Sequence, residues 1–169
     1  MKFLGIVEIV AQSVTWGHPP RKEIIGQTGI VFGTSLPSPA ARHLDHVKCY
    51  VYIASLGQTY CIAAQDLRPV DGQVELESVL PEFAAHFLGF FSYAMGDRVR
   101  RTPESFPEFR AVLAKIEPDY PREALLKCID YGLNDVSTTN RGLFRYSDQS
   151  DDVVRAYLLK YRDALSEGA

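Results

Sequence analysis

Residues that could bind a metal or take part in catalysis gather in one short stretch, His43-Leu44-Asp45-His46, with Cys49 shortly after it. Imidazole, carboxylate and thiolate groups are all ligands of divalent metals. No second cluster is present to complete a tetrahedral site, and on a strand that starts here His46 and Cys49 would point to opposite faces. The sequence also has no G-x-S-x-G, H-E-x-x-H or paired-carboxylate pattern. Ordinary loop polarity explains the stretch, so we predict no metal, no cofactor and no catalytic residue.

A second stretch, IIGQTGIVFG from Ile24 to Gly33, carries three glycines and could cradle a phosphate. A phosphate loop needs a helix after its glycines, but Pro37 and Pro39 follow closely and disfavour one. We therefore predict a strand from Gly29 to Phe32, entered through a turn at Gly26. In this interpretation the glycines, Gly29 and Gly33 included, supply positive φ at the corners of a sheet.

Composition and charge limit the class of partner. The chain has 169 residues, with 18 Lys and Arg against 21 Asp and Glu, for a formal net charge of -3. This balance does not favour binding to nucleic acid or to a membrane surface. The most apolar stretch, from Phe83 to Met95, contains His86 and is too short to span a bilayer. A cytoplasmic location is the expectation.

Three cysteines, Cys49, Cys61 and Cys128, show no C-x-x-C spacing. We predict that they are small buried apolar residues rather than reactive thiols. A tight hairpin turn would place Cys61 opposite Tyr52, and a bulge would place it opposite Val51. Neither register pairs it with Cys49, so no disulfide is expected.

The pattern of apolar residues divides the chain near Ser78. Before this point the alternation is typical of short strands, and after it the spacing is helical. The predicted fold is α+β: a small antiparallel five-stranded β-barrel over residues 1–78, and a helical region of about four helices over residues 79–169, packed on the barrel. The predicted strands cover residues 3–11, 29–32, 47–55, 58–63 and 73–77, and the predicted helices centre on residues 83–94, 109–116, 125–133 and 154–165.

The first half resembles a known family. The glycine run Ile25–Gly33, the aromatic segment Tyr50–Ile53, the run Gly57–Ile62 and the Asp66-Leu67 turn are similar to the Src-homology-three (SH3)-like immunity proteins of bacterial polymorphic toxin systems. In that family an I-x-G-x-x-G-x-V-x-G run opens the second strand, and an aromatic hairpin ends at an acidic D/E-L turn. The resemblance covers roughly residues 3–77 and implies an SH3-like barrel.

The resemblance also implies a function: neutralisation of a cognate toxin domain by tight stoichiometric binding, without chemistry performed by this chain. Binding energy at such interfaces is concentrated in a few anchors, and charge steers association. We expect contacts from two loops, residues 13–22 and 34–46, and from the acidic start of the last helix. The expected partner-binding residues are Trp16, His18, His43, Asp45, Asp148, Asp151 and Asp152.

Two alternatives remain open at this point. One is a regulatory or scaffold module that recognises a peptide or another protein. The other is a small enzyme that uses His43, Asp45 and Cys49 with a metal or a thiolate.

Overall fold

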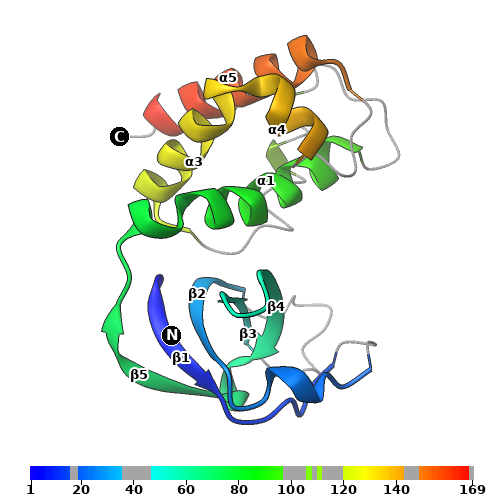
Figure 1. Ribbon diagram of the computed structural model, residues 1–169. Helices are drawn as coiled ribbons and strands as arrows, with labels where there is room; N and C mark the ends of the chain where they lie inside the picture. Colours follow the sequence, from blue (N-terminus) through cyan, green and yellow to red (C-terminus); the bar gives the residue numbers. More distant parts are fainter. Residues whose placement is uncertain are drawn as a thin grey trace. The chain divides into compact units, whose positions relative to one another are not determined.

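The computed structural model describes residues 1–15, 19–35, 47–96, 106–107, 110–111, 120–142 and 149–167. Within these residues the chain is α+β, with one five-stranded antiparallel sheet and four α-helices, as predicted. It divides into two compact units (Figure 1). The sheet unit is formed mainly by Met1–Val79, and the helical unit by residues from Leu80 onward.

The sheet unit contains one curved sheet with the strand order β4-β3-β2-β1-β5 (Figure 1). Because β1 pairs with both β2 and β5, the first strand of the chain lies inside the sheet and the last strand forms an edge. The strands are β1 (Gly5–Ile9), β2 (Thr28–Ser35), β3 (Lys48–Ile53), β4 (Gln58–Ala63) and β5 (Leu67–Gln73). Among the described residues, three short 3-10 helices accompany them: η1 (Lys22–Ile24), η3 (Ala64–Asp66) and η4 (Leu76–Val79).

The glycine run forms the turn into β2 and the strand itself, which confirms the strand interpretation. Gly26 has the positive φ of a turn, +82°. Gly29 and Gly33 do not have positive φ, so this part of the prediction was wrong. Gly29 is needed for packing instead: a Cβ there would lie 2.4 Å from Val51 Cγ1 and 2.8 Å from the Tyr52 carbonyl oxygen. The backbones of β2 and β3 approach too closely for a side chain.

The fifth strand was predicted in the wrong place. Residues 73–77 were expected to form it, but β5 is Leu67–Gln73 and the chain then turns into η4. Pro69 lies inside β5, and its presence made this segment look like a connection between strands. Proline is tolerated on an edge strand because the N–H that it lacks is not needed there for pairing.

The hairpin of β3 and β4 has a longer turn than either predicted register assumed. Four residues, Ala54–Gly57, connect the strands, so Cys61 lies opposite Tyr50 and Cys49 opposite Ile62. The expectation that Cys61 does not face Cys49 is confirmed, and all three cysteines are free. Cys49 and Cys128 are buried, while Cys61 is partly buried.

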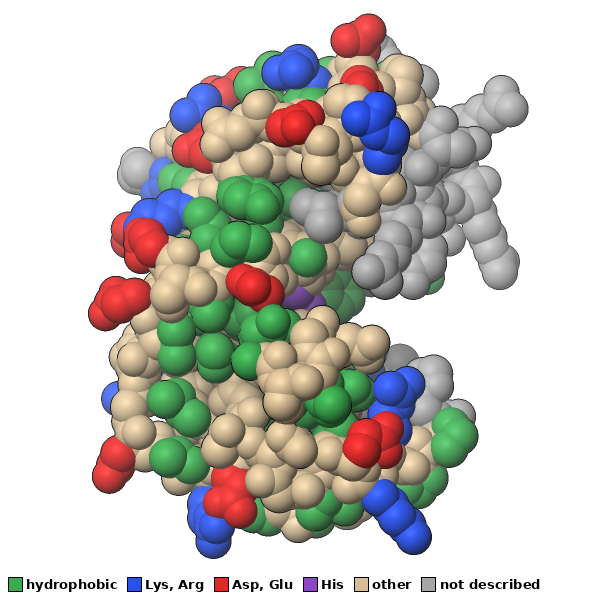
Figure 2. Space-filling model, in the orientation of Figure 1, with side chains coloured by type: hydrophobic (Ala, Val, Ile, Leu, Met, Phe, Trp, Pro, Cys, Tyr) green, Lys and Arg blue, Asp and Glu red, His purple; other side chains and the backbone are tan. Residues whose placement is uncertain are grey.

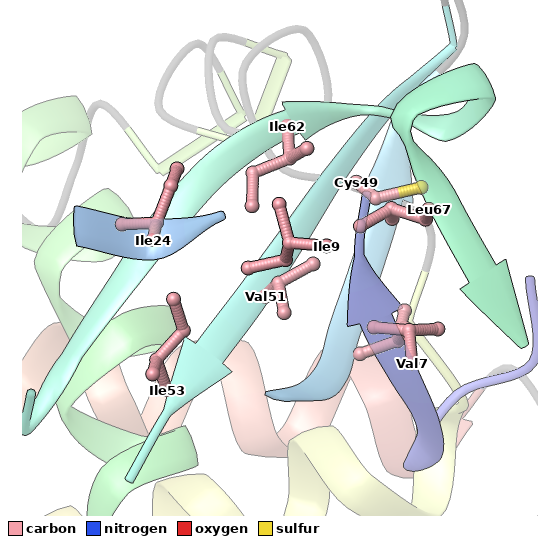
Figure 3. Packing of buried hydrophobic residues seen from close by; sticks show 9 residues of the cluster. Val7, Ile9, Ile24, Cys49, Val51, Ile53, Ile62 and Leu67 are labelled. Carbon is pink, nitrogen blue, oxygen red and sulfur yellow. The ribbon is translucent and has the colours of Figure 1, made fainter. Parts of the chain in front are cut away.

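The core of the sheet unit is aliphatic. Side chains from β1, η1, β3, β4 and β5 point toward one another in Figure 3. Alternation along β3 makes the arrangement possible, because its buried and partly exposed residues alternate strictly. The cluster consists of Val7, Ile9, Ile24, Val31, Cys49, Val51, Ile53, Ile62 and Leu67.

The helical unit contains α1 (Leu80–Gly96), α3 (Arg122–Asn134), α4 (Val136–Gly142) and α5 (Asp151–Glu167). The first, third and last predicted helices correspond to α1, α3 and α5. The predicted helix over 109–116 lies mostly outside the described residues. Helix α3 packs on both α1 and α5, and α4 packs on α3 and α5. Three rings, Phe87, Phe91 and Tyr161, join α1 to α5 at centroid distances of 5.7–6.2 Å.

Helix α4 was not predicted, because its sequence VSTTNRG has no apolar stripe and low helix propensity. Asp135 starts it: Oδ1 accepts a hydrogen bond from the Thr138 amide at 3.0 Å, and Oδ2 one from the Thr138 hydroxyl at 2.7 Å. These hydrogen bonds lower the pKa of Asp135, and the one from the Thr138 amide contributes most. The buried Thr139 hydroxyl donates to the Gly132 carbonyl at 3.0 Å and ties α4 to α3. An Asp in the N-cap position was the one sequence signal for this helix.

Candidate partner-binding site

The first candidate region lies where β1 leaves the sheet. Asp66, at the end of η3, is only 3% exposed. Its carboxylate accepts a hydrogen bond from the Ser13 amide at 2.7 Å and from the Ser13 hydroxyl at 2.8 Å. Its carbonyl oxygen accepts one from the Val10 amide at 2.9 Å. Asp66 therefore holds the segment Val10–Ser13 through both its main chain and its side chain.

The same segment is tied to the start of η1. The Gln12 side-chain oxygen accepts a hydrogen bond from the Arg21 amide at 2.6 Å. The Arg21 guanidinium lies over the Tyr60 ring, 5.3 Å from its centroid. The Gln65 side-chain amide donates to the Ser13 hydroxyl at 2.8 Å and completes the set. We call these six residues, Gln12, Ser13, Arg21, Tyr60, Gln65 and Asp66, the loop stem.

Two apolar side chains near the loop stem face solvent. Val10 is 43% exposed and Ile25 is 46% exposed. The Gly26 amide donates to the Ile9 carbonyl at 2.7 Å, which brings the ends of η1 and β1 together. Exposed apolar groups beside a fixed arginine and tyrosine are the mixture found at protein interfaces.

Most of the residues predicted from the sequence to contact the partner lie outside the described residues. Trp16 and His18 belong to the loop whose stem is described above, and the 34–46 loop contains His43 and Asp45. Asp148 likewise precedes the described start of α5. For these five residues the prediction stays a prediction.

The acidic start of α5 is described. Asp151 and Asp152 are both exposed in the first turn. Asp151 also has a structural role, because its Oδ1 accepts a hydrogen bond from the Asn140 side-chain amide at 2.8 Å. The same amide donates to the Gln149 carbonyl at 2.9 Å, so Asn140 of α4 fixes the chain that leads into α5. Asp152 is the better placed of the two for contact with a partner.

The thiols are poorly suited to chemistry. Burial raises the pKa of Cys49, raises that of Cys61 to about 11, and raises that of Cys128 well above its usual value. A thiolate nucleophile needs the opposite shift. His86 on α1 packs edge-on against Phe90 at 5.2 Å, and burial lowers its pKa to about 3. His86 is thus neutral at physiological pH.

Neither the distribution of charge nor the possible metal ligands single out a site among the described residues. Figure 2 shows acidic and basic side chains interspersed over the face in view. Among the described residues, no group of three or more His, Cys, Asp or Glu side chains could hold a metal ion. No helix in the described parts of the chain is long and apolar enough to cross a membrane.

Sequence reasoning missed the loop stem as a unit. Asp66 was noticed only as part of an acidic turn, and Ser13 only as the first residue of the 13–22 loop. Their contact joins residues 53 positions apart and has no periodic signal in the sequence. No protein-family model, curated protein or solved structure matches this chain.

Proposed function

We propose that this chain is an immunity protein that neutralises a cognate bacterial toxin domain by tight stoichiometric binding, with a sheet unit of the SH3-like barrel class. The observation that carries the proposal is where the resembling motifs lie in the fold. The glycine run leads into the second strand, β2. The aromatic hairpin of β3 and β4 leads directly to Asp66-Leu67, which joins η3 to β5. Both positions are those that the family pattern requires.

The strand order supports the barrel class. Because β5 pairs with β1, the first and last strands of the sheet unit lie side by side. The sheet is curved, and its concave side holds the aliphatic cluster of Figure 3. Small closed or nearly closed antiparallel sheets bury their cores in this way.

The side chains favour binding over chemistry. Cys49, the cysteine of the alternative enzyme interpretation, is fully buried in the core, and its pKa is raised. The exposed groups at and beside the loop stem are cationic (Arg21) and apolar (Val10 and Ile25), and the partly buried Tyr60 lies under Arg21; Arg and Tyr are common interface anchors. Inhibition by occlusion needs nothing more than such a surface.

The test is co-expression with the toxic domain encoded by the adjacent reading frame. We expect growth rescue that follows the expression level of this chain, and calorimetric titration of the purified proteins should give a one-to-one complex. The double variant His43→Ala/Asp45→Ala removes two expected contact residues, so the complex should weaken, but rescue should remain at high expression because neither side chain is proposed to perform chemistry. Cys49→Ala is tested separately with a folding check, since Cys49 is part of the core.

Two results would contradict the proposal. Rescue by clearly sub-stoichiometric amounts would indicate turnover. Absence of any complex with the adjacent toxic domain, from a folded protein, would exclude neutralisation by binding of that domain.

A further inference from the structure

The most unusual polar group in the sheet unit is the Asp66 carboxylate. It is one of three buried polar or charged side chains among the described residues, with Ser92 and Thr139, and the only one that can carry a full charge. Moving a carboxylate out of water is costly unless hydrogen bonds replace its hydration. Among the residues that the structure describes, the hydrogen bonds to the carboxylate come from one residue, Ser13.

Ser13 belongs to no strand or helix. It lies beyond the end of β1 at Ile9, where the chain has left the sheet. The sheet pairing does not need this contact, because β1 and β5 already pair at Ile9 and Leu67. The buried carboxylate therefore fixes a connection rather than the sheet.

Other residues of the loop stem also anchor this connection. Gln65 donates to the Ser13 hydroxyl, so that hydroxyl both donates to Asp66 and accepts from Gln65. Gln12 binds the Arg21 amide on the far side of the connection. Both described ends of the connection, Ser13–Thr15 and Pro19–Arg21, are thus anchored by side chains.

We propose that Asp66 is a positioning residue: through Ser13 it orders the loop stem in advance, so that the exposed side chains Val10, Arg21 and Ile25 form a prepared contact surface for the toxin domain. The inference rests on the proposed function for the identity of the partner. Its physical basis is entropy, since a surface already ordered in the free protein loses less conformational freedom on binding.

The experiment compares four variants of the full chain. Ser13→Ala removes the hydroxyl, and Asp66→Asn removes one of the two acceptor oxygens. Ser13→Thr keeps both the amide and a hydroxyl and should restore the contact. Ser55→Ala is the matched control, because the Ser55 hydroxyl also donates to a side chain of the sheet unit, Gln27, at 2.9 Å, and neither residue belongs to the loop stem.

Two measurements are made on each variant. Backbone heteronuclear NOE values report the order of Val14 and Thr15, and calorimetry reports the affinity for the toxic domain encoded beside this chain. We expect Ser13→Ala and Asp66→Asn to lower both NOE values and to weaken binding about tenfold. Ser13→Thr and Ser55→Ala should behave as the wild type in both measurements.

The outcomes separate this inference from the proposed function. Unchanged NOE values in Ser13→Ala and Asp66→Asn would overturn the ordering role of Asp66. Lower NOE values with unchanged affinity would show that the loop stem is not the contact surface. If the wild type does not bind the toxic domain, the proposed function and the binding role fail, and the NOE comparison still decides whether Asp66 orders the stem.

Discussion

The two units build their cores from different side chains. The main cluster of the sheet unit consists of aliphatic residues and one cysteine, and Phe32 of β2 is a buried ring outside that cluster. The helical unit uses large rings from α1 and α5, with Phe87, Phe91, Tyr157 and Tyr161 all buried. In the sheet unit, hydrogen-bonded strand register decides which side chains meet. In the helical unit, the size of a few rings decides how closely the helices approach.

The comparison predicts where each unit is vulnerable. A sheet with fixed strand spacing should fail when a single atom is added between backbones. A helical unit held by aromatic rings should fail when a ring is removed.

Phe91→Ala should have the largest effect. Phe91 is fully buried and contacts Phe87 and Tyr161. Its loss should lower the free energy of unfolding by about 4 kcal/mol, from lost burial and the cavity left behind. Denaturant titration followed by circular dichroism measures the change. Phe91→Leu is the control and should lose well under half as much; a loss below about 1 kcal/mol in Phe91→Ala would show that the rings do not hold the helical unit.

Gly29→Ala should come next. The added Cβ would meet Val51 Cγ1 and the Tyr52 carbonyl oxygen, and a backbone atom cannot move aside as a side chain can. We expect a loss of about 3 kcal/mol in the free energy of unfolding. Gly26→Ala is the matched control: nothing lies within 4 Å of its Cβ, so only the positive φ opposes it, at a loss of about 1 kcal/mol. Equal losses would show that strand spacing is no special constraint in the sheet unit.

The smallest effect should be the acid sensitivity due to His86 in the helical unit. Its pKa is lowered by burial from 6.5 to about 3, so the unfolded chain binds a proton between these pH values and the folded chain does not. The contribution of neutral His86 is complete above pH 6.5 and falls as the pH is lowered toward 3. Between pH 7.5 and pH 5.5, His86→Gln should reduce the loss of stability on acidification by at most about 1.4 kcal/mol, because His86 binds at most one extra proton on unfolding. Denaturant titration at several pH values measures the free energy of unfolding of the wild type and of His86→Gln. The same dependence on pH in both proteins would show that His86 does not cause the acid sensitivity.

Prediction from the sequence succeeded where a periodic pattern was long. Alternation over Lys48–Ile53 located β3, and the apolar stripes located α1, α3 and α5. It failed where one residue gave a misleading local signal, as Pro69 did in β5. It also failed for α4, whose helical state depends on packing against α3 and α5 and not on its own composition.

For the candidate site, the sequence alone correctly placed the acid pair Asp151 and Asp152 at the start of a helix. Contact through the two loops stays a prediction. The sequence alone could not reveal the loop stem, because hydrogen bonds between Ser13 and Asp66 depend on how the strands bring distant residues together. The same holds for the contact of Arg21 with Tyr60.

The sequence was sufficient to predict the α+β class, the division near Ser78 and most of the strands and helices. These follow from local periodicity and composition, which act over a few residues. The tertiary structure alone decided that Gly29 is required by close packing, that Cys61 lies opposite Tyr50, and that a buried carboxylate holds the loop stem. Each of these depends on strand register, which is set by the whole sheet and not by any one segment.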